Sequence, residues 1–256
     1  PKLFKYLSKE GISVIIDETL GSSILNTRSP IIDYYLYYII KKLREHDELK
    51  KIRLFDLGCT VAEHFDFLDL LIRADSIDDV SANDLISYVG LDSSPSALLA
   101  AQMFHNELIG PDFELLLSEG AQHDFPPQSF DLSLTVGVVN HLSDPMRGLE
   151  KLFSLTRHAC VLALWVTKED EGRWVQSHGG LATYFFSRSD LLRMREVMPE
   201  SRYLYSHFIP DVDTTNPKGY VGVGEEVIAK LGCYHLIYTN MELADHEFSA
   251  LHELKL

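Results

Sequence analysis

Basic residues are scarce in this sequence of 256 residues. The chain has 23 lysines and arginines against 38 aspartates and glutamates, and its formal net charge at pH 7 is −15. The acids are spread along the chain, so their field repels phosphate backbones and anionic lipid. We therefore expect neither a nucleic-acid partner nor a membrane partner. The sequence also lacks any apolar run near the roughly 20 residues that span a bilayer.

Cysteine is scarce too, and the three cysteines, Cys59, Cys160 and Cys233, are an odd number. Each falls in or beside an apolar run that favours a buried strand. No CxxC pair and no cysteine–histidine cluster has the spacing of a zinc site, so we expect no metal. Reduced thiols in a cytoplasmic protein fit this pattern best.

The composition is otherwise that of a soluble globular protein, with 46% hydrophobic and 24% charged residues. Apolar runs typical of strands alternate with helical patterns. Strands are predicted at 51–57, 88–92, 113–117, 130–136, 160–166, 203–209 and 234–239. Helices are predicted at 61–73, 94–103, 145–158 and 187–197, and an inserted loop with one turn of helix at 74–87. This alternation favours an α/β fold with a doubly wound, mostly parallel seven-stranded sheet and helices on both faces.

A further helix is predicted over residues 30–46, because isoleucine and leucine recur there on one face. We expect residues 1–48 to form an N-terminal helical cap that does not fold independently, and residues 49–256 to form the α/β domain. Four tyrosines crowd this helix between residues 34 and 38. They either pack the helix on the sheet or, in part, roof a ligand pocket.

The first strand of the α/β domain ends in a turn that is typical of a ligand site. Asp56 closes the apolar run, Gly58 makes the turn, and a helical pattern begins near Val61. Asp92 ends the second strand in the same way. The carboxyl ends of parallel strands leave a crevice, so both acids are expected to face a ligand there. A carboxylate in that position suits the two hydroxyls of a ribose.

Four stretches then resemble successive motifs of one known family. They are FDLGC at 55–59, GLDSS at 90–94, FPPQSFDL at 125–132 and GVVNHL at 137–142. They are similar to the motifs of class I S-adenosylmethionine-dependent methyltransferases. The resemblance covers roughly residues 51–166 and implies a Rossmann-like fold. It also implies S-adenosylmethionine as the cofactor and S-adenosylhomocysteine as its product.

The resemblance also implies which residues hold the methionine end of the cofactor. They belong to the first turn and to the end of the fourth strand: Asp56, Gly58, Cys59, Thr60, Thr135, Val136 and Gly137. One departure concerns the first turn. The family usually has further glycines where this chain has Thr60 and Ala62, which predicts an altered approach of the cofactor.

The nucleoside end is assigned by the same resemblance. Asp92 would accept hydrogen bonds from the ribose hydroxyls, with Ser93 beside it. Glu119 would contact the adenine amino group, and the backbone of Gly120 and Ala121 would contact the ring.

His141 is the best-placed candidate for a catalytic base, since it follows the fourth strand near the reactive end of the cofactor. A structural or capping role is the alternative. Weaker candidates for the site are His64, His178, Tyr184 and His207, together with Arg28 as a partner of the cofactor carboxylate.

The N-terminal helix and the segment 174–219 are expected to build a lid over the site. The segment holds aromatic residues that form either an acceptor pocket or ordinary core: Trp174, Tyr184, Phe185, Phe186, Tyr203, Tyr205 and Phe208. We therefore expect S-adenosylmethionine-dependent methyl transfer to a small-molecule acceptor. The alternative is a catalytically inactive S-adenosylmethionine-binding protein with a degenerate first motif.

Overall fold

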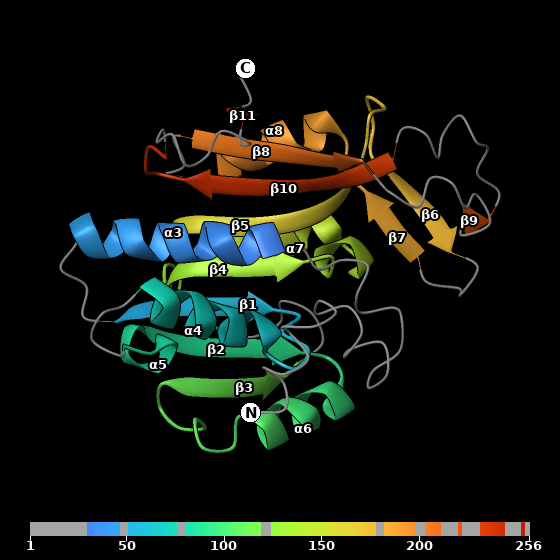
Figure 1. The fold of residues 1–256 in the computed structure, drawn as a ribbon. Coiled ribbons are helices and arrows are strands. Elements are labelled where there is room, and N and C mark those ends of the chain that lie inside the picture. Colours follow the sequence, from blue (N-terminus) through green and yellow to red (C-terminus); the bar gives the residue numbers. More distant parts are fainter. Residues whose placement is uncertain are drawn as a thin grey trace.

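The computed structural model describes residues 30–46, 51–75, 80–118, 124–177, 182–197, 203–210, 220–221, 231–243 and 252–253. Its centre is a sheet with the strand order β11-β8-β10-β5-β4-β1-β2-β3 (Figure 1). The strands are β1 (Ile52–Leu57), β2 (Ile86–Asp92), β3 (Phe113–Leu117), β4 (Phe130–Val136), β5 (Thr156–Thr167), β8 (Tyr203–Pro210), β10 (Leu231–Thr239) and β11 (His252–Glu253).

Strands β1 to β5 are parallel to one another, whereas β10 is antiparallel to both of its neighbours, β5 and β8. The two-residue β11 adds to the edge beside β8. The mostly parallel, doubly wound sheet of seven strands is thus confirmed, with β11 as a short addition. Because β1 lies between β2 and β4, the chain reverses its order there, and folds of this kind bind ligands in a crevice at the carboxyl ends of these strands.

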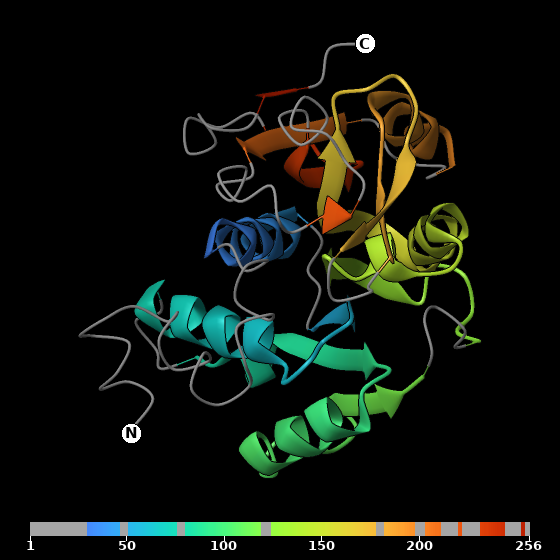
Figure 2. The ribbon, with the colours of Figure 1, turned by 90° about the vertical axis from the view of Figure 1, so that its right-hand side faces the viewer.

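Helices cover both faces of the sheet (Figure 2). On one face lie α3 (Pro30–His46) and α4 (Glu63–Asp75), and Leu98 of α6 (Pro95–Phe104) joins their core cluster. The other face is covered by α7 (Pro145–Leu155) and α8 (Arg188–Val197).

The N-terminal helix α3 packs on the sheet rather than standing away from it. Its apolar face is buried, with Leu36 and Ile39 both 0% exposed. Tyr35 and Tyr38 are buried in the same cluster, so these two tyrosines pack the helix on the sheet. The domain boundary that we expect near residue 48 falls in residues 47–50, outside the described part of the chain.

Several elements differ from the sequence predictions at their ends. Helix α4 begins at Glu63 rather than residue 61, because Thr60 and Ala62 have positive φ angles of 48° and 61°. Helix α7 ends at Leu155, since β5 starts at Thr156, four residues earlier than expected. The expected loop at 74–87 has its one turn of helix as α5 (Ala82–Leu85), but β2 begins at Ile86, two residues earlier than expected.

The sequence prediction missed a second, small sheet. Its order is β7-β6-β9, formed by β6 (Arg173–Ser177), β7 (Ala182–Phe185) and β9 (Tyr220–Val221). Figure 1 shows these strands beyond the carboxyl ends of β4 and β5. The backbone of Phe186 fixes the small sheet there, because it exchanges hydrogen bonds with Trp165 and Thr167 at the end of β5.

Candidate active site and cofactor site

The first turn is held in shape by hydrogen bonds to β2. The backbone N–H groups of Gly58 and Cys59 donate to the carbonyl of Leu91, at 2.7 and 3.1 Å. Gly58 has a φ angle of +82°, in the left-handed region that favours glycine. A Cβ atom on Gly58 would lie 2.0 Å from Cγ2 of Val138, which follows β4. Both the backbone and the packing therefore require glycine at this position.

The altered part of the turn keeps left-handed backbone geometry without glycine. Thr60 donates its N–H to Oδ2 of Asp92 at 2.9 Å, and its hydroxyl donates to Glu63 at 3.3 Å. The N–H of Ala62 donates to the carbonyl of Cys59 at 2.7 Å. These bonds offset the steric cost of a left-handed residue, which is roughly 1–2 kcal/mol.

Asp92 joins the first turn to the following helix. Its carboxylate accepts from the N–H of Thr60 and, at 2.8 Å, from the N–H of Ser94. Ser94 is the N-cap of α6 and accepts from the N–H of Ala97, while Ser93 is exposed. A carboxylate offers about four acceptor positions, so two remain for the hydroxyls of a ribose. Asp92 thus fits the predicted role chemically, at the end of β2.

Asp56 lies deeper than Asp92 and is 1% exposed. Its Oδ2 atom accepts from the hydroxyl of Tyr88 at 2.7 Å. Burial raises the pKa of Asp56 to about 6, even though the charge of His64 and the Tyr88 hydrogen bond both lower it. Asp56 is therefore a carboxylate with an unusually costly charge, directly before the first turn.

The end of β4 contributes mainly backbone to the crevice. The side chain of Thr135 lies in register with Leu57 and Leu162 and is fully buried. No described residue hydrogen-bonds to its hydroxyl. Gly137 has a φ angle of +68° and donates its N–H to the carbonyl of Ala163 at 2.8 Å. Val136, between them, is half-buried.

His141 lies in the short 3-10 helix η2 (Val139–His141) and faces the small sheet. Its Nδ1 atom is 3.1 Å from the carbonyl of Ala182 and 3.3 Å from the hydroxyl of Thr183, both on β7. Because a carbonyl can only accept, Nδ1 carries a hydrogen in that bond, and Nε2 of the neutral ring is left as an acceptor. The contact anchors η2 to β7 and leaves one nitrogen for chemistry.

Asn140 is a residue whose role sequence reasoning missed. It is 0% exposed, and its Nδ2 atom donates to the carbonyls of Trp165 and Tyr184, at 3.0 and 2.5 Å. Its Oδ1 atom accepts from the N–H of Trp165 at 3.2 Å. The side chain therefore ties η2 to both β5 and β7. The sequence indicates this position only through the neighbouring His141, which is the predicted candidate.

Of the two alternatives left open for the late aromatic residues, core or acceptor pocket, the structure assigns two residues to the core. Phe185 and Phe186 are 0% exposed and belong to the core, because β7 and the residue after it turn these rings inward. Trp174 on β6 is 45% exposed and makes an edge contact with Tyr184, at 5.4 Å between ring centroids. Among the aromatic side chains of this region that the structure describes, Trp174 is the most exposed.

Several predicted residues cannot be placed. Arg28, Glu119, Gly120, Ala121 and His178 lie outside the described residues. The backbones of three strand residues are described, but not their side chains: Tyr205, His207 and Phe208.

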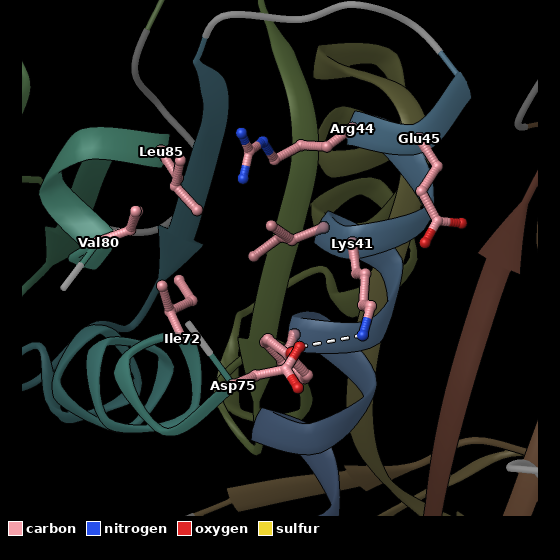
Figure 3. Close-up of a pocket in the computed structure, with 9 residues that line it drawn as sticks. Lys41, Arg44, Glu45, Ile72, Asp75, Val80 and Leu85 are labelled. Carbon is pink, nitrogen blue, oxygen red and sulfur yellow. Dashed lines mark hydrogen bonds and ion pairs between the residues drawn. The ribbon is translucent and has the colours of Figure 1, made fainter. Parts of the chain in front are cut away.

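A surface pocket of about 350 Å³ lies elsewhere, between α3, α4 and α5 (Figure 3). It is lined in part by Lys41, Arg44, Asp75 and Leu85, and an ion pair of 3.0 Å joins Lys41 to Asp75. It lies at the last turns of α3 and α4, whereas the crevice lies at their first turns. Half-exposed ion pairs of this kind contribute little to stability, and the pocket plays no part in the cofactor site.

Two further findings concern the described residues alone. None of their helices is both long enough and apolar enough to cross a membrane. They contain no group of three or more histidine, cysteine or acidic side chains that could hold a metal ion.

Comparison with known proteins agrees with this geometry. Residues 55–164 match a family model described as a methyltransferase domain. No curated protein matches the chain. Among solved structures, the chain resembles the 1,6-didemethyltoxoflavin-N1-methyltransferase of Burkholderia thailandensis with bound S-adenosylhomocysteine. The identity is 12%, the TM-score is 0.54, and the match covers 93% of this chain and 91% of that chain.

Two other solved structures share the fold with a similar identity and TM-score. The N-terminal domain of EvdMO1 with bound S-adenosylhomocysteine has 13% identity and a TM-score of 0.54, and the match covers 83% of this chain and 81% of that chain. The [4+2]-cyclase SpnF has 14% identity and a TM-score of 0.52, with 80% and 81% covered.

Residues 55–164 thus form a methyltransferase domain, and the chain has the Rossmann-like fold of class I S-adenosylmethionine-dependent methyltransferases. The domain indicates methyl transfer with S-adenosylmethionine as the cofactor. Nothing in the comparisons supports the alternative of an inactive binding protein.

Replacing Asp92 with alanine is expected to weaken S-adenosylmethionine binding by at least about tenfold, which corresponds to about 1.4 kcal/mol. The change removes the predicted acceptor for the ribose hydroxyls and the acceptor of two backbone N–H groups. Calorimetric titration measures the loss. Asp84→Ala is the matched control, because Asp84 also accepts two bonds, from Ser81, but is an exposed residue of α5. An unchanged affinity in Asp92→Ala would remove Asp92 from the site.

Proposed function

We propose that this methyltransferase acts on a small-molecule acceptor that binds between the crevice and the small sheet of β6, β7 and β9. The observation that supports the proposal is Trp174, a half-exposed aromatic side chain on a sheet fixed at the end of β5. An indole face offers a large, rigid contact surface to a planar or apolar molecule. The net charge of −15 disfavours nucleic-acid acceptors.

One relative in fold supports the same class of acceptor. The Burkholderia enzyme was crystallised with 1,6-didemethyltoxoflavin together with S-adenosylhomocysteine. That compound is a small molecule, and the match spans nearly all of both chains. At 12% identity the resemblance supports the size of the acceptor and not its structure.

Methyl transfer requires the protein's own residues mainly to position the two reactants. S-adenosylmethionine supplies a methyl group on a sulfonium, which is transferred by an in-line displacement. Holding the acceptor atom in line and excluding water can provide most of the acceleration. A base is needed only where the acceptor atom arrives protonated. His141 then remains the candidate, since its Nε2 atom is free to accept a proton while Nδ1 is held by Ala182.

The test is methyl transfer from labelled S-adenosylmethionine to a panel of small phenols, amines, thiols and nitrogen heterocycles. Intact protein and RNA are offered in parallel. Label in one or more small molecules supports the proposal. Label that appears only in protein or RNA would overturn it.

Trp174→Ala is expected to raise the KM for the acceptor roughly five- to tenfold, as the loss of one aromatic contact predicts. The affinity for S-adenosylmethionine should stay within about twofold, because Trp174 lies on the small sheet and not on the first turn. Phe104→Ala is a matched control, since Phe104 is 63% exposed but ends α6. If Trp174→Ala changes neither KM nor kcat, the acceptor does not use this surface.

A further inference from the structure

Three buried ionisable groups meet where α3, α4 and β1 approach the first turn. Asp33 in the first turn of α3 is 1% exposed, and His64 at the start of α4 is 6% exposed. Their Oδ1 and Nδ1 atoms are 2.6 Å apart. Asp56, at the end of β1, interacts with the charge of His64. The proposed methyl transfer does not use the pair Asp33–His64.

The cluster is acidic apart from the histidine. Glu63 on α4 and Asp92 on β2 add negative charge that acts on Asp56, and Tyr88 on β2 donates its hydroxyl to it. The thiol of Cys59 in the turn is neutral, since burial raises its pKa far above the ordinary range. Among these neighbours, only His64 can supply a positive charge that favours the ionised form of Asp56.

The hydrogen bond to Asp33 keeps that positive charge in place. Burial by itself lowers the pKa of His64, but the hydrogen bond and charge of Asp33, with the charges of Asp56 and Glu63, raise it above the usual value. Loss of the Asp33 carboxylate would thus leave a buried histidine that prefers to be neutral.

We propose that Asp33 and His64 are positioning residues that keep Asp56 ionised, so that a buried negative charge beneath the first turn favours S-adenosylmethionine over S-adenosylhomocysteine. The two ligands differ by the methyl group and the positive charge of the sulfonium. A buried carboxylate acts strongly on such a charge because the local dielectric constant is low. The proposal rests on the cofactor assignment and is independent of the acceptor.

The ratio of the two dissociation constants isolates this effect. Both ligands carry the same amino and carboxyl groups, so titration of those groups largely cancels in the ratio. The sulfonium has no proton to lose and stays charged at every pH. Any pH dependence of the ratio Kd(S-adenosylhomocysteine)/Kd(S-adenosylmethionine) therefore reports on the protein's own charges.

The experiment is calorimetric titration with both ligands between about pH 5 and pH 8, on the full chain. In the wild type the ratio should fall roughly three- to tenfold as the pH drops through the range near 6 where Asp56 takes up a proton. In His64→Gln the fall should occur about one pH unit higher, because Asp56 has lost its cation. Asp33→Asn should shift the pH of this fall in the same direction but by less. It provides a second test if His64→Gln does not fold.

His105→Gln is the matched control. His105 is also a buried histidine, 5% exposed, and its Nε2 atom is 3.1 Å from the carbonyl of Val61 in the same turn. It is expected to lower stability without moving the midpoint of the ratio. A ratio that is independent of pH in the wild type, or an unchanged midpoint in both His64→Gln and Asp33→Asn, would overturn the proposal. If the wild type binds neither ligand, the cofactor assignment fails and this proposal with it.

Discussion

Replacing Gly58 with alanine is expected to destabilise the protein by roughly 2–4 kcal/mol and to abolish measurable binding of S-adenosylmethionine. Two costs add. Alanine is strained at the φ angle of +82°, and its Cβ atom would lie 2.0 Å from Cγ2 of Val138. Relief of the contact requires Val138 to move, which displaces the turn that carries the hydrogen bonds to Leu91. Urea denaturation and calorimetric titration measure the two losses.

The double variant Gly58→Ala/Val138→Ala separates the two costs. Truncating Val138 removes both γ-methyl groups but leaves its Cβ atom, at 2.9 Å from the new one. We expect the double variant to recover part of the lost stability and little of the affinity, because the strained φ angle remains. Gly110→Ala is the control, since a Cβ atom there meets nothing closer than 3.8 Å. If Gly58→Ala were as stable as Gly110→Ala, the described turn would be wrong.

The sequence predicted the sheet well where the strands are buried and their ends are marked. β3 and β4 begin and end where they were expected, because apolar runs there are bounded by polar, glycine or proline residues. The small sheet was missed for the opposite reason. β6 is a short strand in which polar side chains outnumber apolar ones, and its pairing with β7 and β9 makes it a strand. Such pairing between segments is not visible in local composition.

In the candidate site, too, residues marked by a local motif could be predicted, and residues whose role depends on distant partners could not. Asp56, Gly58 and Asp92 could be predicted as candidates from the sequence because each is tied to a recognisable motif on its own strand or turn. Asp33 and Tyr88 were not, since their roles depend on partners 31 and 32 residues away, His64 and Asp56. The altered first motif was interpreted as an altered turn. The structure keeps left-handed geometry at Thr60 with a hydrogen bond to Asp92, a partner that no local pattern reveals.

Replacing Asp56 with asparagine is expected to stabilise the protein at pH 7.5 while it reduces the affinity for S-adenosylmethionine. The pKa of Asp56 is raised from 3.8 to about 6 in the folded state, mainly by burial. The folded state therefore binds a proton more tightly than the unfolded state. The stability that this proton provides is fully present below pH 3.8 and is lost as the pH rises to about 6. Two pH units correspond to roughly 3 kcal/mol.

Asparagine keeps the size of the side chain and can still accept the hydrogen bond from Tyr88, but it carries no charge. The gain in the free energy of unfolding should be smaller than the full 3 kcal/mol, at roughly 1–2 kcal/mol. The reason is that the positive charge of His64 loses one of its acidic partners. Urea denaturation at pH 4 and pH 7.5 tests the sign. The two proteins should be similar at pH 4, and the variant should be more stable at pH 7.5. A variant that is less stable at both values would show that Asp56 is not ionised at a cost.

Asp56→Asn is also expected to change how the protein discriminates between the two ligands. If Asp56 supplies the negative charge that favours the sulfonium, Asp56→Asn should bring the affinities for S-adenosylmethionine and S-adenosylhomocysteine closer together by roughly three- to tenfold at pH 7.5. The ratio should also lose its pH dependence near pH 6. A more stable protein with a weaker preference for its cofactor is the behaviour expected of a residue that is kept for function at the expense of stability. If Asp56→Asn were more stable and still discriminated fully between the two ligands, the charge of Asp56 would not be the source of the preference, and the proposal would be wrong.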